Sequence, residues 1–340
     1  MQLAPLIEAT RGDMTECVHF GAIAVVNAQG KLIASAKGHA DTAHWPTFTR
    51  STLKAFQALP FMESGGAENF DFSSPDLAML CASHSGQAMH VQQVDSMLCK
   101  IEQPYQALRC GCHVPLQFTY FNQSAPKDTV FDERHNNCSG KHAGFLAYCV
   151  QHGHSLTNYE AMNHPLQAAI RRDVASACGI TQAQLHAGID GCSAPNYAMP
   201  LSALARGYAR LATGLRDTQY GASFEALGNA MVAHPELVSG TGRNDAAFMR
   251  TGRGDWITKI GADGAQVVAS RSRGQALAVK LIDGNMQAVY AATVAALDQL
   301  GWLDEAQRAE LAVWRATPIK NARGIEVGAR HAVFKLSGKA

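Results

Sequence analysis

The order of the predicted elements constrains the fold of this chain more than any other feature. Near the N-terminus, Cys17–Asn27 is rich in β-branched and aromatic residues, and Ala28-Gln29-Gly30 separates it from Lys31–Lys37. This pattern predicts a β-hairpin. After Gly254, short apolar runs alternate with glycine-containing turns, which predicts a meander over 255–261, 266–271 and 276–282. Strand-like segments at both ends of the chain can pair in one antiparallel sheet.

Apolar residues recur at helical spacing between these two ends. The predicted helices cover Ser51–Leu59, Ser139–Gln151, His164–Cys178 and Met199–Leu211, and an amphipathic helix over Met286–Leu300 follows the meander. We therefore expect an α+β fold, in which helices flank an antiparallel sheet built from the N- and C-terminal segments and a helical insertion forms a second lobe. The expected organisation is one domain over 1–340, with a sheet lobe from 1–50 and 254–340 and a mainly helical lobe from 51–253.

Composition and charge exclude several classes of partner. The chain is 47% hydrophobic and 17% charged, and 29 basic residues balance 28 acidic ones. This composition is not that of a disordered protein, and no basic run suits a phosphate backbone or an anionic membrane, so we expect neither partner. Residues 1–16 do not resemble a secretory signal, and nine scattered cysteines indicate reduced thiols. A cytoplasmic location is expected.

Two serines and two lysines stand where they could share a proton. Ser51 and Lys54 lie one helical turn apart, and a lysine of lowered pKa can activate a serine nucleophile. The alternative is an N-cap serine beside a solvated lysine. Ser83 follows an apolar helix, and Lys259 lies on a strand before Gly261, although it could also be an ordinary exposed strand residue. This order of motifs is the layout of the penicillin-binding and serine β-lactamase fold.

Two separated cysteines lie in polar segments of the sequence. Cys138 belongs to a run of eight residues from His135 to His142, and Cys192 lies in a loop bounded by glycine and proline. Together with Lys141, one helical turn after Cys138, they could bind zinc through thiolates and a neutral amine. The spacing is not a standard zinc signature, and small buried cysteines are the alternative.

Taken together, these segments resemble the rhizobial-type bacterial L-asparaginase II family. The resembling stretches occur in family order; they are Arg50-Ser51-x-x-Lys54-x-x-Gln57, Cys81-Ala82-Ser83-His84-Ser85-Gly86, His135-Asn136-x-Cys138-Ser139-Gly140-Lys141-His142, Asp190-Gly191-Cys192-Ser193-x-Pro195 and Lys259-x-Gly261-Ala262-x-Gly264. The resemblance implies hydrolysis of L-asparagine to L-aspartate and ammonia on a fold similar to serine β-lactamases and bacterial glutaminases. It also implies a homodimer with no organic cofactor.

The resemblance assigns roles to particular residues of this sequence. It places two catalytic pairs, Ser51 with Lys54 and Ser83 with Lys259, and a zinc site formed by Cys138, Lys141 and Cys192. Arg50, His142 and Asp190 are candidates for contacts with the substrate. Which serine attacks the amide stays open.

Three alternative functions also stay open. The first is a serine amidase of related fold that acts on another amide, such as glutamine or a β-lactam. The second is a non-catalytic metal or thiol sensor that uses Cys138 and Cys192. In the third, the Ser-x-x-Lys pair is a relic in a protein that only binds a small molecule.

Overall fold

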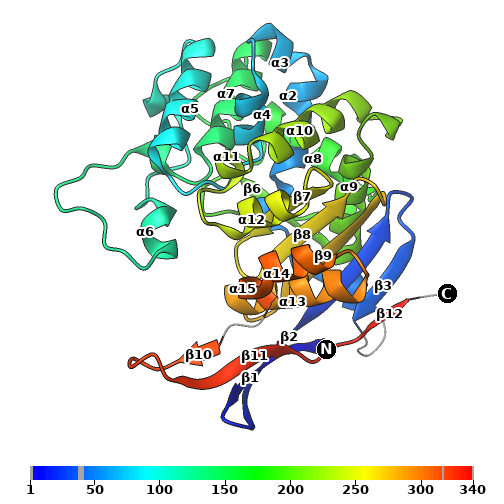
Figure 1. Ribbon diagram of the computed structural model, residues 1–340. Helices are drawn as coiled ribbons and strands as arrows, with labels where there is room; N and C mark the ends of the chain where they lie inside the picture. Colours follow the sequence, from blue (N-terminus) through cyan, green and yellow to red (C-terminus); the bar gives the residue numbers. More distant parts are fainter. Residues whose placement is uncertain (1–2, 37–41, 316–317, 339–340) are drawn as a thin grey trace. The chain divides into compact units, whose positions relative to one another are not determined.

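A computed structural model describes residues 3–36, 42–315 and 318–338 of the chain (Figure 1). Backbone contacts divide the chain into two compact units. The first unit contains residues 1–52, 199–212 and 251–340, and the second contains residues 53–198 and 213–250. The first unit carries a large antiparallel sheet and the second is mainly helical, so the fold is a mixed one, consistent with the expected α+β class. The predicted division into one domain with two lobes stays a prediction.

Nine of the described strands form one curled antiparallel sheet in the first unit. Their order is β10-β11-β1-β2-β9-β8-β7, and β3 pairs with both β2 and β12. The bounds are β1 (Ala4–Arg11), β2 (Met14–Asn27), β3 (Leu32–Ala36), β7 (Trp256–Gly261), β8 (Ala265–Ser270), β9 (Gln275–Leu281), β10 (Pro318–Lys320), β11 (Glu326–Ala332) and β12 (Leu336–Gly338). Figure 1 shows N-terminal strands in blue beside C-terminal strands in orange and red.

The long strand β2 joins the two ends of the chain. It pairs with β9 from Gly21 opposite Leu281 to Asn27 opposite Gln275, and on part of its length it also pairs with β3. The predicted hairpin, the predicted meander of β7, β8 and β9, and the pairing of both chain ends in one sheet are thereby confirmed. Lys37, at the end of the predicted hairpin, lies outside the described residues.

Burial explains why the meander appears as short apolar runs in the sequence. Strands β7 and β8 are buried at every position, and the turn between them uses the left-handed residues Asp263 and Gly264. Helix α13 (Met286–Gln299) packs against β1, β8, β9 and β11, and the alanines on it allow a close approach. The other elements of this unit are β4 (Pro46–Phe48), α9 (Leu201–Thr213), α14 (Glu305–Glu310) and α15 (Ala312–Arg315).

The second unit is built mainly of helices around α7 (Ser139–His152), which contacts α2, α3, α4, α5 and α8. Its other elements are α1 (Lys54–Gln57), α2 (Leu59–Glu63), α3 (Gly66–Asn69), α4 (Ser74–Leu80), α5 (Ala88–Lys100), α6 (Leu116–Tyr120), α8 (Pro165–Cys178), β5 (His186–Ile189), β6 (Pro195–Pro200), α10 (Gly221–Ala233), α11 (Pro235–Val238) and α12 (Asn244–Thr251). None of the helices that the structure describes is long and apolar enough to cross a membrane.

Two glycines let α7 pack closely against α4. A Cβ atom on Gly140 would lie 2.4 Å from the backbone oxygen of Met79, and one on Gly144 would lie 2.3 Å from Leu80 Cδ2. Side chains at these two positions, one helical turn apart, would push the helices away from each other. The start of α7 is therefore held beside the loop that follows α4, and both segments carry predicted site residues.

The predicted helix over Ser51–Leu59 is wrong as a single helix. A 3₁₀ helix covers Arg50–Leu53, α1 covers Lys54–Gln57, and α2 begins only at Leu59. Pro60 at the second position of α2 has no N–H group to continue the hydrogen-bond ladder from α1. The boundary between the two units follows Thr52.

Candidate active site

The predicted site residues are distributed over both units. Each predicted serine–lysine pair has one member in each: Ser51 and Lys259 belong to the first unit, and Lys54 and Ser83 belong to the second. Of the other candidates, Arg50 lies in the first unit, while the second contains Cys138, Lys141, His142, Asp190 and Cys192.

In the first unit, the end of β7 holds the segment that carries Ser51. Lys259 is fully buried in this strand, and its Nζ donates a 3.2 Å hydrogen bond to the neighbouring carbonyl oxygen. A Cβ atom on Gly261 would lie 2.9 Å from the backbone oxygen two residues before Ser51, so this contact requires glycine. Arg50 forms an ion pair with Asp263 in the turn after β7. The arginine is therefore already paired in this structure.

In the second unit, Ser83 is fixed at three points. Its backbone N–H donates to the Val238 oxygen at 2.8 Å, and its carbonyl oxygen accepts from Arg243 Nη1 at 2.7 Å. The hydroxyl oxygen accepts from Asn137 Nδ2, also at 2.8 Å. The Ser83 side chain is therefore held in a buried, pre-organised position. Neither Asn137 nor Arg243 was predicted from the sequence.

Lys54 lies against the same loop. Its side chain is buried, and Nζ donates to the backbone oxygens of Ala82 and Asn137, the second at 3.1 Å. Two carbonyl oxygens next to Ser83 and Cys138 thus orient the amine. Lys54 and Ser83, which belong to different predicted pairs, are connected through Asn137.

Two stacked histidines brace the Ser83 loop. The rings of His84 and His90 have centroids 4.9 Å apart and are nearly parallel. His84 Nδ1 accepts from the Gly86 N–H group at 3.1 Å, so its Nε2 carries the proton and donates to Ser139 Oγ at 2.8 Å. This bond ties the loop to the first residue of α7. Burial is the main cause that lowers the pKa of both rings, to about 4 for His90.

The low pKa of His90 predicts loss of stability in acid. Between the ordinary value of 6.5 and about 4, the unfolded chain binds a proton on this ring that the folded chain does not. The contribution of His90 to the free energy of unfolding should therefore be fully retained above pH 6.5 and fall by about 1.4 kcal/mol for each pH unit between 6.5 and about 4. Reversible denaturant unfolding at several pH values measures this slope.

His90→Gln should lower by one the number of protons that the chain takes up when it unfolds in acid, and so reduce the dependence of the free energy of unfolding on pH. His186→Gln, at an exposed position, is the matched control and should leave this dependence unchanged. Equal slopes for the wild type and His90→Gln would show that His90 does not limit stability in acid.

Cys138, Lys141 and Cys192 meet in the second unit. Cys138 and Lys141 stand at the start of α7, and the turn between β5 and β6 brings Cys192 to them, with Ser193 in the left-handed region at φ 69°. Lys141 Nζ contacts Cys192 Sγ at 3.1 Å, and the Cys138 thiol donates a hydrogen bond to Cys192. All three side chains are buried, and both cysteines are free thiols.

This contact polarises the cluster. The hydrogen bond from Cys138 and the charge of Lys141 hold the pKa of Cys192 far below its usual range, although burial acts in the opposite direction. Donation of that same bond, together with burial, raises the pKa of Cys138. Burial disfavours the charged form of Lys141, but attraction to the two sulfurs raises its pKa. The directions of these pKa shifts favour a thiolate at Cys192, a thiol at Cys138 and an ammonium group at Lys141.

His142 points a buried N–H donor at the cluster. The Tyr159 hydroxyl accepts from the Arg109 N–H group at 2.7 Å, so its own proton is donated to His142 Nδ1 at 2.8 Å. The Nε2 atom then carries the ring proton, and its one interaction among the described residues is with Cys192. Burial lowers the pKa of His142, and the nearby Cys192 acts against that shift.

Buried cations accumulate in this part of the second unit. Lys54, Lys141 and Arg243 are each at most 3% exposed, and none pairs with a carboxylate among the residues that the structure describes. The Arg243 guanidinium also lies 3.8 Å from the centre of the Tyr120 ring and donates to the Tyr120 hydroxyl. Asp190 acts on Lys141 through its negative charge and raises the pKa of the lysine. Cys192 offsets the charge of Lys141, and an anionic ligand would offset that of Arg243.

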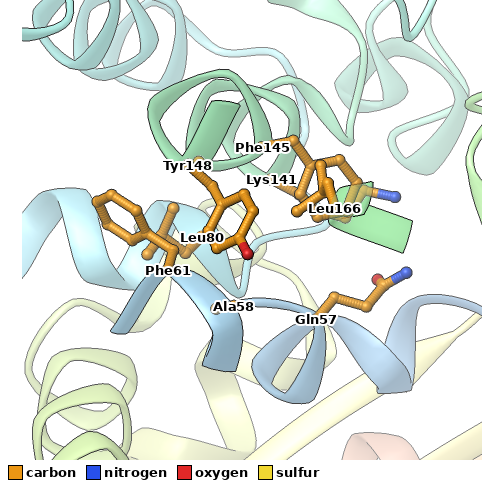
Figure 2. A pocket seen from close by; sticks show the side chains of 9 residues that line it. Gln57, Ala58, Phe61, Leu80, Lys141, Phe145, Tyr148 and Leu166 are labelled. Atoms are coloured by element: carbon orange, nitrogen blue, oxygen red, sulfur yellow. The ribbon is translucent and has the colours of Figure 1, made fainter. Parts of the chain in front are cut away.

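A small cavity borders Lys141 on its other side. Figure 2 shows Phe61, Tyr148 and Phe145 lining it together with Lys141, whose Nζ lies 5.1 Å from the centre of the Phe145 ring. The cavity has room for about one water molecule. It is too small to hold an amino acid, so it is a packing void beside the site and not a binding pocket.

The cluster offers a metal ion one deprotonated sulfur, but its other two groups must lose protons before they can bind. Among the described residues, no group of three or more His, Cys, Asp or Glu side chains could hold a metal. The predicted set contains two sulfurs and an amine, and the thiolate of Cys192 is already formed as zinc requires. Cys138 and Lys141 would each have to release a proton on binding.

Buried serine, lysine, cysteine and histidine side chains beside one loop are the groups that hydrolytic enzymes use, and fold and site together indicate this class of protein. The chain belongs to the L-asparaginase II family, whose pattern matches residues 7–332 of 340. The resemblance seen in the sequence motifs is thereby confirmed at the level of the family. No curated protein gives a significant match to the chain. Family membership supports asparagine amidohydrolase activity and a small-molecule substrate.

Proposed function

We propose that this protein hydrolyses L-asparagine to L-aspartate and ammonia through a serine nucleophile. The match to the L-asparaginase II family over residues 7–332 is the observation that carries the proposal. Buried Arg243, which pairs with no carboxylate among the described residues, supports it, because the carboxylate of an amino-acid substrate would compensate its charge. The buried His142 N–H group beside Cys192 adds a further donor at this cluster.

In the proposed first step, Lys54 accepts the proton of Ser51, and Ser51 Oγ attacks the side-chain amide carbon of asparagine. Backbone N–H groups at the start of the helical segment stabilise the negative charge on the amide oxygen. Ser83 then passes a proton, supplied by Lys259, to the leaving nitrogen, so that ammonia departs and an aspartyl ester remains on Ser51. Water then hydrolyses this ester and regenerates the serine. Arg50 and Asp190 are proposed substrate contacts.

We propose zinc as the group held by Cys138, Lys141 and Cys192. When bound, zinc would supply a positive centre that orients a polar group of the substrate. The Cys192 thiolate supports this assignment, since it is the form in which cysteine binds metals. No organic cofactor is proposed.

The serine β-lactamase-like fold, the homodimer and the cytoplasmic location stay proposals derived from the resemblance and the cysteine content. The antiparallel sheet built from both chain ends is compatible with that fold. Nine free cysteines are compatible with a reducing compartment.

A substrate panel tests the proposed reaction. Ammonia release is measured with L-asparagine and L-glutamine side by side, and a chromogenic β-lactam is tested on the same preparation. We expect turnover of asparagine and at least about 100-fold less of glutamine, because a pocket fitted to one chain length positions the longer amide poorly. If glutamine or the β-lactam is turned over faster than asparagine, that compound is the substrate and asparagine is not. A folded, zinc-loaded sample without any turnover would favour the metal or thiol sensor.

A further inference from the structure

Asn137 contacts two of the proposed catalytic residues at once. Its side-chain Nδ2 donates to Ser83 Oγ at 2.8 Å, and its backbone oxygen accepts from Lys54 Nζ at 3.1 Å. The two catalytic groups come from separate segments of the second unit, and Asn137 links them in addition to the bond from Lys54 to the Ala82 oxygen. It stands one position before Cys138, and the resemblance to known proteins gives it no role.

We propose that Asn137 is a positioning residue that sets the direction of the Ser83 hydroxyl proton and holds Lys54 in fixed relation to Ser83. The proposal rests on the proposed function, because it is the asparaginase reaction that gives Ser83 and Lys54 their roles. It extends that function by a residue that acts through its neighbours.

The chemistry of a primary amide makes the contact directional. The amide nitrogen only donates, so Ser83 Oγ must accept this bond, and the Ser83 proton points away from Asn137. The amide is also neutral. It therefore orients the hydroxyl without placing a negative charge beside Lys54, which would raise the pKa of a lysine intended to act as a base.

Asn137 is itself rigidly held. The backbone N–H group of Asn137 donates to His113 Nε2 at 3.0 Å. Its backbone oxygen also accepts from the His84 N–H group at 3.2 Å. Since α7 begins two residues later, the backbone of Asn137 is anchored from both directions, as a positioning role requires.

Two variants isolate the contact with Ser83, because both keep the backbone oxygen that binds Lys54. Asn137→Ala removes the amide, and we expect kcat for ammonia release from asparagine to fall at least about 10-fold while KM changes less than about 3-fold. Asn137→Asp is nearly isosteric but replaces the donor with a charged acceptor. We expect a similar or larger loss of kcat, and the ascending limb of the activity profile should move upward by about one pH unit.

Asn229→Ala, at an exposed position of α10 in the same unit, is the matched control and should keep the wild-type rate and pH profile. Wild-type kinetics in both Asn137 variants would overturn the proposal while leaving the asparaginase function intact. A loss confined to the melting temperature and folded fraction of Asn137→Ala, with a normal rate and unshifted pH profile in Asn137→Asp, would show a merely structural role and also overturn it. A wild-type protein without amide turnover would refute the proposed function, and this role with it.

Discussion

Replacing Ser51 by Ala is expected to abolish turnover of asparagine, with kcat/KM lower by at least about 10³-fold, because the proposed nucleophile is removed and no other group takes its place. The protein should stay folded. Ser51 is only 9% exposed, but its hydroxyl forms no hydrogen bond with the residues that the structure describes, so its loss leaves no partner unsatisfied. Ammonia release and a thermal melt on the same sample measure both effects.

Ser83→Ala distinguishes the two serines. If Ser83 relays a proton, this variant should lose about 10²-fold in kcat and still form the ester. Ser35→Ala, at a partly exposed position of β3, is the control for the replacement of a serine outside the proposed site, and this variant should remain fully active. Near-normal activity of Ser51→Ala combined with complete loss in Ser83→Ala would exchange the two roles.

Replacing Cys192 by Ala is expected to have the second large effect, a loss of zinc affinity of at least about 100-fold. Cys192 supplies the preformed thiolate, and without it the cluster contains only the protonated Cys138 and Lys141. Competition with a chromogenic chelator measures the affinity. Cys178→Ala removes another buried cysteine, on α8, and should retain zinc. Equal affinities in the two variants would exclude Cys192 as a ligand.

Chelation of the wild-type protein separates the two roles of a metal at this cluster. If zinc orients the substrate, as proposed, removal should chiefly raise KM and leave the melting temperature nearly unchanged. A fall of melting temperature and kcat together would instead assign the metal to the structure.

The sequence was sufficient to predict the strands and turns that neighbouring residues determine, but not the pairings between distant segments. The meander was predictable because β7 and β8 are buried on both faces and bounded by glycine turns. The pairing of β1 with β11 was not predicted, since it joins Ile7 to Ala332 through strands of mixed polarity without clear alternation. The helix at Ser51 was predicted as continuous, because apolar spacing does not reveal the break that ends α1 before Pro60.

The same distinction applies to the site. Cys138, Lys141 and Cys192 were predicted as a group, and the structure brings them together in the second unit. Asn137 and Arg243 were missed, because their roles come from tertiary contacts with Ser83 that no spacing in the sequence encodes. The dense polar run around Cys138 was the one available signal for Asn137, and it did not distinguish that residue from its neighbours.

The most direct test of the account is to identify the residue that carries the covalent intermediate. The enzyme is mixed with asparagine, quenched in acid within the first turnover, digested, and analysed by peptide mass spectrometry. If Ser51 is the nucleophile, we expect an aspartyl ester on the peptide that contains Ser51 and no ester in the Ser51→Ala variant. An ester on the peptide that contains Ser83, or steady turnover with no ester on either peptide, would contradict it.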